Sequence, residues 1–232
     1  MNSLLLLNGS PRGERSNSMK MLAWVAEGWQ QGGGQTPEVL HLARRTGFDR
    51  AVEAFAGAGV VMLGMPLYTD AMPAIVKDYF EALAPRVEAA ASGALNPPLA
   101  FLVQSGFPEA LHSRPLERYL EKLARRLGSP CAGTIVRGGG EALQVMPDEA
   151  NRKLWTLLRT LGEQLARDGR FGEAELKAVA GVERFTALAA AAAGLIFKLP
   201  FAQFYWNGQL KKNGAWERRF AAPYAPAYRV RG

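Results

Sequence analysis

Five short runs of apolar residues recur along the chain, and helical patterns fill the intervals between them. We predict a buried β-strand for each run, over residues 3–8, 38–42, 60–64, 99–104 and 134–136. The runs are continuously apolar rather than alternating, which is typical of strands covered on both faces. Such strands form parallel sheets, whose neighbours are joined by helical crossovers. The sequence therefore predicts an α/β fold: a doubly wound three-layer sandwich around a five-stranded parallel sheet.

The intervals carry the helical periodicity that this fold requires. One apolar face follows Ser16 and must end at the glycine run 32–34. Leucines at helical spacing over 116–127 follow Ser113, a predicted N-cap, and Pro115 in the first turn. The other helices are predicted over residues 48–56, 74–91 and 148–165.

Size and cysteine content limit the classes of protein. The 232 residues fit one α/β domain with an extension, and we expect the boundary near residue 180, with 181–232 as the extension. Cys131 is the single cysteine, which excludes an internal disulfide, a four-cysteine metal cluster and a CxxC redox pair. Residues 4–7 are too short a run for a secretory signal, so we expect a cytoplasmic protein.

Ligands of such a sheet bind beyond the carboxyl ends of the strands, and the first loop there reads NGSPRGERSNS over residues 8–18. It offers hydroxyls, an amide, cations and the N–H groups of a helix N-terminus, which are the parts of a phosphate site. The alternative is that Ser16 only caps the helix and the arginines are solvated. The loop matches neither GxGxxG nor GxxxxGK[ST]. Its phosphate-binding candidates are Ser10, Arg12, Ser16, Asn17 and Ser18.

Two further loops follow predicted strands. In MPLYTDAMP, Pro66 and Pro73 stiffen the chain and are expected to expose Leu67 and Tyr68, an apolar surface for a flat ring, with polar edges from Thr69 and Asp70. In VQSGFPE, the turn Ser105-Gly106-Phe107 lets backbone N–H groups approach a ligand. The alternatives are an ordinary proline-rich turn and an ordinary strand-to-helix connection.

Three stretches in this order, GSPR with a following SNS, MPLYTDAMPAIVKDYFEAL and VQSGFPE, resemble the flavodoxin-like NAD(P)H-dependent oxidoreductases of the NADPH-dependent FMN reductase family. The resemblance covers roughly residues 3–165. It implies a flavodoxin-like domain over 1–180 and a bound FMN, with Ser10, Arg12, Ser16, Asn17 and Ser18 on its phosphate. Pro66 to Thr69 would flank the isoalloxazine, and Ser105, Gly106 and Phe107 would border its pyrimidine edge. Phe80-Glu81 departs from the Asp-Arg pair of many family members.

The same resemblance implies NADPH or NADH as electron donor and a small-molecule acceptor such as a quinone, flavin, nitro or azo compound. Hydride transfer needs no general base, and the two histidines, His41 and His112, form no metal-ligand or triad pattern. We therefore assign no catalytic side chain and no metal. The alternatives are a flavin-binding electron carrier or regulatory flavoprotein that reacts with a protein partner, and a scaffold without flavin.

The C-terminal extension differs from the rest of the chain. Residues 185–197 carry no charge but are too few for a spanning helix, so we expect a buried helix packed on the core or on a partner. The last 35 residues hold seven cationic side chains and one carboxylate, a net charge of +6 out of +7 for the chain, together with eight aromatics. Such a surface fits, in this order, a second subunit, a cover over the flavin, an anionic membrane surface or nucleic acid. No nucleic-acid motif accompanies it, so we expect no nucleic-acid partner. We predict a homodimer with the tail in its interface and a possible peripheral membrane contact through the tail.

Overall fold

The computed structural model describes residues 3–89, 96–197 and 203–222. The chain divides into two compact units, residues 1–184 and residues 185–232. The first unit contains the whole β-sheet and all the predicted ligand loops. The fold and the candidate site are therefore properties of residues 1–184.

The sheet of the first unit has five strands, all parallel, in the order β2-β1-β3-β4-β5. The strand bounds are β1 Leu4–Asn8, β2 Glu38–His41, β3 Val60–Pro66, β4 Leu99–Gln104 and β5 Cys131–Arg137. The predicted five-stranded parallel sheet is confirmed. Strand β5 begins at Cys131, earlier than the predicted residue 134. The prediction missed this start because Cys131 is exposed and Gly133, with a φ of 115°, interrupts the apolar pattern.

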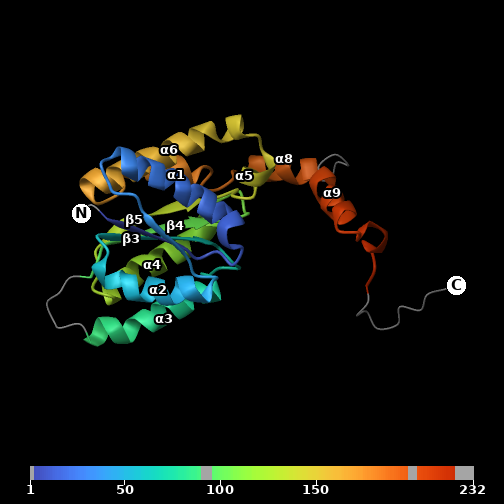
Figure 1. Ribbon diagram of the computed structural model, residues 1–232. Helices are drawn as coiled ribbons and strands as arrows, with labels where there is room; N and C mark the ends of the chain where they lie inside the picture. Colours follow the sequence, from blue (N-terminus) through green and yellow to red (C-terminus); the bar gives the residue numbers. More distant parts are fainter. Residues whose placement is uncertain (1–2, 90–95, 198–202, 223–232) are drawn as a thin grey trace. The chain divides into compact units, whose positions relative to one another are not determined.

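Helices cover both faces of the sheet, with α1 and α6 on one face and α2, α3 and α4 on the other (Figure 1). The short helices α5 and α7 follow β5 and α6 and were not predicted from the sequence. The helix bounds are α1 Asn17–Gln31, α2 Arg45–Ala54, α3 Ala74–Ala89, α4 Arg114–Arg126, α5 Ala142–Val145, α6 Asp148–Asp168 and α7 Glu173–Ala180. The three-layer sandwich is thus confirmed.

Strand β1 shows how the apolar runs build two cores. Leu4 and Leu6 pack into the cluster that contains α1 and α6, whereas Leu5 and Leu7 pack into the cluster on the opposite face. Helices α1 and α6 cross so closely that a Cβ at Gly28 would collide with the carbonyl oxygen of Arg159. The glycine permits this crossing. The crossing fixes α1, whose N-terminus lies at the first ligand loop.

The start of α4 differs in one detail from its prediction. Ser113 is the N-cap residue, as predicted, but its side chain makes no capping hydrogen bond. A 3-10 turn over Ala110–Ser113 precedes the helix and holds Ser113 in a helical conformation, from which its hydroxyl cannot reach the free N–H groups.

The second unit contains α8 (Ala187–Phe197), α9 (Phe204–Lys212) and a 3-10 turn over Trp216–Arg218. Leu188 and Leu195 of α8 are 82% and 66% exposed in the single chain, and the packing of this helix on the core or on a partner stays a prediction. No helix in the described part of the chain is long and apolar enough to cross a bilayer.

Candidate functional site

Polar side chains gather where β1, β3, β4 and β5 end, at the edge of the sheet where ligands of such folds bind. Most of them are shielded from water, although they belong to loops and to the first turn of α1. The buried polar residues at this edge are Asn8, Ser10, Ser16, Asn17, Ser18, Gln104 and Ser105. Four loops meet here rather than the three that the sequence predicted.

Asn8, the last residue of β1, organises the first loop. Its Oδ1 accepts hydrogen bonds from the Ser10 N–H at 3.1 Å and from the Ser16 hydroxyl at 3.4 Å. Its Nδ2 donates to the Gly13 carbonyl at 2.7 Å. The loop is therefore held in shape by one buried amide that sequence reasoning missed as a site residue, although its place as the first polar residue after an apolar run was a usable signal.

The loop leads into α1 with a cap and an unpartnered amide. The Ser16 hydroxyl accepts the Met19 N–H at 3.1 Å, so Ser16 does cap the helix. Asn17 is only 2% exposed, and neither its Oδ1 nor its Nδ2 has a hydrogen-bond partner among the described residues. A buried amide without partners costs about 1–3 kcal/mol. Capping alone does not explain Asn17, and a polar ligand at the helix N-terminus would.

His41, at the end of β2, supports the same loop from the side. Its Nδ1 lies 3.1 Å from Asn8 Nδ2. Because Asn8 Nδ2 is a donor, His41 Nδ1 acts as the acceptor and the ring is neutral. Burial lowers the pKa of His41, while Glu14 raises it and Arg44 lowers it further. His41 is thus a strand residue, as predicted, with a part in shaping the loop.

The loop after β3 is only partly as predicted. Leu67 is buried in the core, and its N–H donates to the Gln104 carbonyl at 2.7 Å, so the expected exposure of Leu67 is wrong. Tyr68 is 46% exposed, as predicted. Pro66 is buried as the last residue of β3, and Thr69 and Asp70 are exposed.

The tip of this loop is strained. Tyr68 and Ala71 exchange two backbone hydrogen bonds of 3.1 Å, which closes a tight turn at Thr69-Asp70. Thr69 has a φ of 55°, which is unfavourable for a β-branched residue. Strain of this kind gathers at ligand sites.

The loop after β4 is joined to a fourth loop, over residues 138–141, which follows β5. Gly139 and Gly140 donate their N–H groups to the Phe107 and Ser105 carbonyls, both at 2.7 Å. Ser105 Oγ donates to the Phe107 carbonyl at 3.2 Å, while the Phe107 ring is 52% exposed. Gly106 is exposed at the turn. The sequence signal for the fourth loop was the run of three glycines after a strand.

Gln104 links these loops to α1. Its Nε2 lies 3.5 Å from the Ser18 hydroxyl, and its Oε1 has no partner among the described residues. The Gln104 Oε1 lies where a Cβ of residue 140 would stand, so the glycine leaves room for this side-chain position. Arg12 and Glu141 form an exposed ion pair of 3.5 Å between the first and fourth loops. The predicted residues of the first and third loops therefore lie in one connected site.

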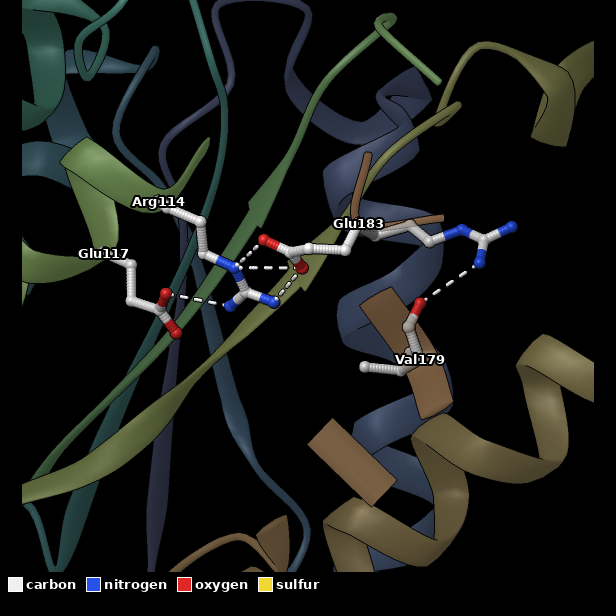
Figure 2. A network of polar contacts seen from close by, with 5 residues as sticks. Arg114, Glu117, Val179 and Glu183 are labelled. Carbon is white, nitrogen blue, oxygen red and sulfur yellow. Dashed lines mark hydrogen bonds and ion pairs between the residues drawn. The ribbon is translucent and has the colours of Figure 1, made fainter. Parts of the chain in front are cut away.

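Residues 182–183, at the end of the first unit, are bound to the segment between β4 and α4. Arg114 donates to Glu183 at 2.7 and 3.0 Å and to Glu117 at 2.8 Å (Figure 2). The hydrogen bond to Glu183 is the main cause that raises the pKa of Arg114, and it lowers the pKa of Glu183. Backbone hydrogen bonds from Ala110 to Val182 and from Leu111 to Glu183 complete this clasp, which is Arg114, Glu117 and residues 182–183.

Comparison with known proteins agrees with this architecture. Residues 2–165 match the family model described as "Flavodoxin-like fold", and the chain belongs to that family. A search of the curated proteins gives no match.

Among solved structures, an azoreductase from Bacillus anthracis str. Sterne has a TM-score of 0.53 at 17% identity, covering 72% of this chain and 100% of its own. An FMN-dependent NADH-azoreductase from Bacillus anthracis str. Ames Ancestor, in complex with FMN, has a TM-score of 0.53 at 16% identity, with coverage of 72% and 100%. An NAD(P)H:quinone oxidoreductase from Methanothermobacter marburgensis has a TM-score of 0.52 at 18% identity, with coverage of 70% and 95%. At these identities the likeness shows the fold.

Proposed function

We propose that this protein is an FMN-dependent oxidoreductase that takes hydride from NADPH or NADH and passes the electrons to a small acceptor such as a quinone, flavin, nitro or azo compound. The single observation that carries the proposal is the buried, unpartnered Asn17 amide at the α1 N-terminus, where a phosphate monoester would meet donors. The solved structures of this fold named above include one in complex with FMN.

The residues of the site fit that cofactor. Ser10, Ser16, Asn17 and Ser18, with the helix N–H groups, would hold its phosphate, and the Arg12 guanidinium would exchange Glu141 for the phosphate. Tyr68, Thr69 and Asp70 would supply one wall for the ring, with Pro66 and Leu67 buried behind them, and Ser105, Gly106 and Phe107 would supply another. FMN rather than FAD is the cofactor we propose, because the resemblance of the three loops to the FMN reductases implies it and one solved structure of this fold is in complex with FMN.

Two exposed aromatic side chains, Tyr68 and Phe107, are the proposed contacts of this chain with the donor and the acceptor. When bound, FMN supplies the hydride-accepting and electron-donating chemistry, and the protein supplies position and electrostatics. Tyr68 and Phe107 offer apolar faces beside the ring site, against which a nicotinamide or a flat acceptor can rest. Asp70 lies at the strained turn and adds a carboxylate to this rim.

The test is the visible absorption of the purified protein after incubation with FMN and desalting, followed by anaerobic NADPH and then NADH. A retained flavin band that bleaches within seconds supports the reductase and identifies the donor. A retained band that neither nucleotide bleaches contradicts it in favour of a carrier or regulatory flavoprotein with a protein partner. No retained band contradicts flavin binding altogether.

The proposed assembly is a homodimer, and light scattering of the flavin-loaded protein tests it. A mass of one chain would contradict the dimer. The interface predicted from the sequence, residues 199–232, lies partly outside the described residues, which include 203–222 of it, and membrane binding of this segment is the competing assignment. The proposed location in the cytoplasm is tested by cell fractionation.

A further inference from the structure

Helix α8 is apolar on every side and exposed. Residues 185–197 contain no charged side chain, and those side chains of α8 that the structure describes are exposed, with Ala189 half-buried. A helix that is hydrophobic all round is normally buried in protein or lipid. Leu188 and Leu195 would otherwise present most of their surface to water. Some apolar environment therefore covers α8 in the functional state.

The segment after α8 combines cations with exposed rings. Lys211 Nζ lies 5.1 Å from the centre of the Trp216 ring, and Arg219 Cζ lies 4.0 Å from it. The same guanidinium lies 4.8 Å from Phe220. Phe204, Trp206 and Phe220 are all strongly exposed. Rings and cations in close succession are typical of segments at the boundary between lipid headgroups and acyl chains.

Charge decides between a second copy of the chain and a lipid surface as the cover. The last 35 residues carry a net charge of +6, so two identical tails packed together would repel each other. Anionic headgroups would instead attract each cation near the surface. Helix α8 has 11 residues, a length of about 16 Å, which is about half of a bilayer core. A helix of this length can enter one leaflet without crossing the membrane.

We propose that residues 185–197 and 203–222 bind the surface of an anionic phospholipid bilayer, with α8 inserted in one leaflet and Lys211, Lys212, Arg218 and Arg219 at the headgroups. In the sequence this segment follows Glu183, which Arg114 holds at the end of the first unit. Resting on the proposed function, this attachment favours an acceptor dissolved in the bilayer, which among the proposed classes is a lipophilic quinone.

The test measures co-sedimentation of the 232-residue chain with vesicles of phosphatidylcholine alone and of phosphatidylcholine mixed with phosphatidylglycerol. Binding is expected on the mixed vesicles and at least about tenfold weaker on the neutral ones. The variant K211Q, K212Q, R218Q and R219Q should lose at least about tenfold in affinity for the mixed vesicles. The matched control, R118Q, K122Q, R125Q and R126Q, neutralises four exposed cations of α4 and should bind like the unaltered protein.

A second variant, L188D with L195D, separates lipid from protein as the cover of α8. Loss of vesicle binding with an unchanged mass on light scattering supports the proposal. Conversion of a dimer to a monomer without any change in vesicle binding overturns it and assigns the tail to the second subunit. Equal binding to both vesicle types also overturns it. Because this assay needs no flavin, and FMN retention is measured on the same samples, failure of the membrane proposal is distinguishable from failure of the proposed function.

Discussion

The two sides of the candidate site are built in opposite ways. On the side proposed for the phosphate (the phosphate side), Ser10, Ser16 and Ser18 are buried, and Asn8 ties the loop together with three hydrogen bonds. On the side proposed for the flavin ring (the ring side), Tyr68 and Phe107 are about half exposed. The phosphate side is thus organised before a ligand arrives, whereas the ring side is open.

This difference indicates a division of labour. A preorganised anchor loses little entropy when it binds, so affinity for the cofactor should depend on the phosphate side. An open, apolar rim leaves room for a donor and an acceptor in turn, so turnover should depend on the ring side. The variants below test this division, beginning with the largest expected effect.

Replacing Asn8 by Leu should weaken FMN binding by about 100-fold, because three hydrogen bonds of about 1 kcal/mol each hold the loop in shape. Fluorescence quenching of FMN on titration measures the affinity. The control is Asn151→Leu, which deletes another buried amide at the start of α6. An equal loss of affinity in both variants would mean that Asn8 has only a general structural role.

Replacing Asn17 by Ala should weaken FMN binding by about tenfold, because the FMN phosphate loses its hydrogen bond with the Asn17 amide. The melting temperature without FMN should stay the same or rise, because an unpartnered buried amide is removed. The matched control is Ser129→Ala, at another buried hydroxyl without a partner among the described residues. Unaltered affinity in Asn17→Ala would remove the main support for a phosphate at this position.

Replacing Thr69 by Asn should stabilise the protein by about 1 kcal/mol, because Asn tolerates a positive φ better than a β-branched residue does. Urea unfolding measures the gain. Thr69→Ala is the control and should gain less. Affinity for FMN should not change in either variant, and a clear change would show that the ring side shares the anchoring of the cofactor.

The smallest expected effect is a pH dependence from His41. Burial lowers its pKa in the folded state below the unfolded value of about 6.5. Its contribution to stability is therefore complete above about pH 6.5 and is lost as the pH falls toward the folded pKa. Urea unfolding at several pH values measures the slope, which His41→Gln should reduce. An identical slope in that variant would show that other groups cause it.

The sequence predicted most of the sheet because β1, β3 and β4 are buried along their whole length. Strand β2 forms as predicted, but it is exposed or half-buried at every residue, so the prediction of a buried strand is wrong there. The sequence also failed at the start of β5, where Gly133 and the exposed Cys131 interrupt the apolar pattern. It also predicted an exposed Leu67, because a loop leucine between two prolines gives no sign of which way its side chain turns. The predicted residues of the first and third loops were found in one site, yet Asn8, Gln104 and the 138–141 loop were missed. Their roles depend on contacts between distant strands, such as Gln104 with Ser18, which no local pattern reveals.

The clasp at Arg114 also separates the protein into two modules for the purpose of engineering. Because Glu183 is tied to the third loop by a bidentate ion pair, the first unit is closed before the tail begins. A different C-terminal segment, such as a fluorescent domain or a surface-immobilisation tag, can thus be joined after Arg184 and will be displayed from a defined point near the candidate site. The clasp therefore makes the position after Arg184 a suitable junction for fusions that direct the protein to a new location.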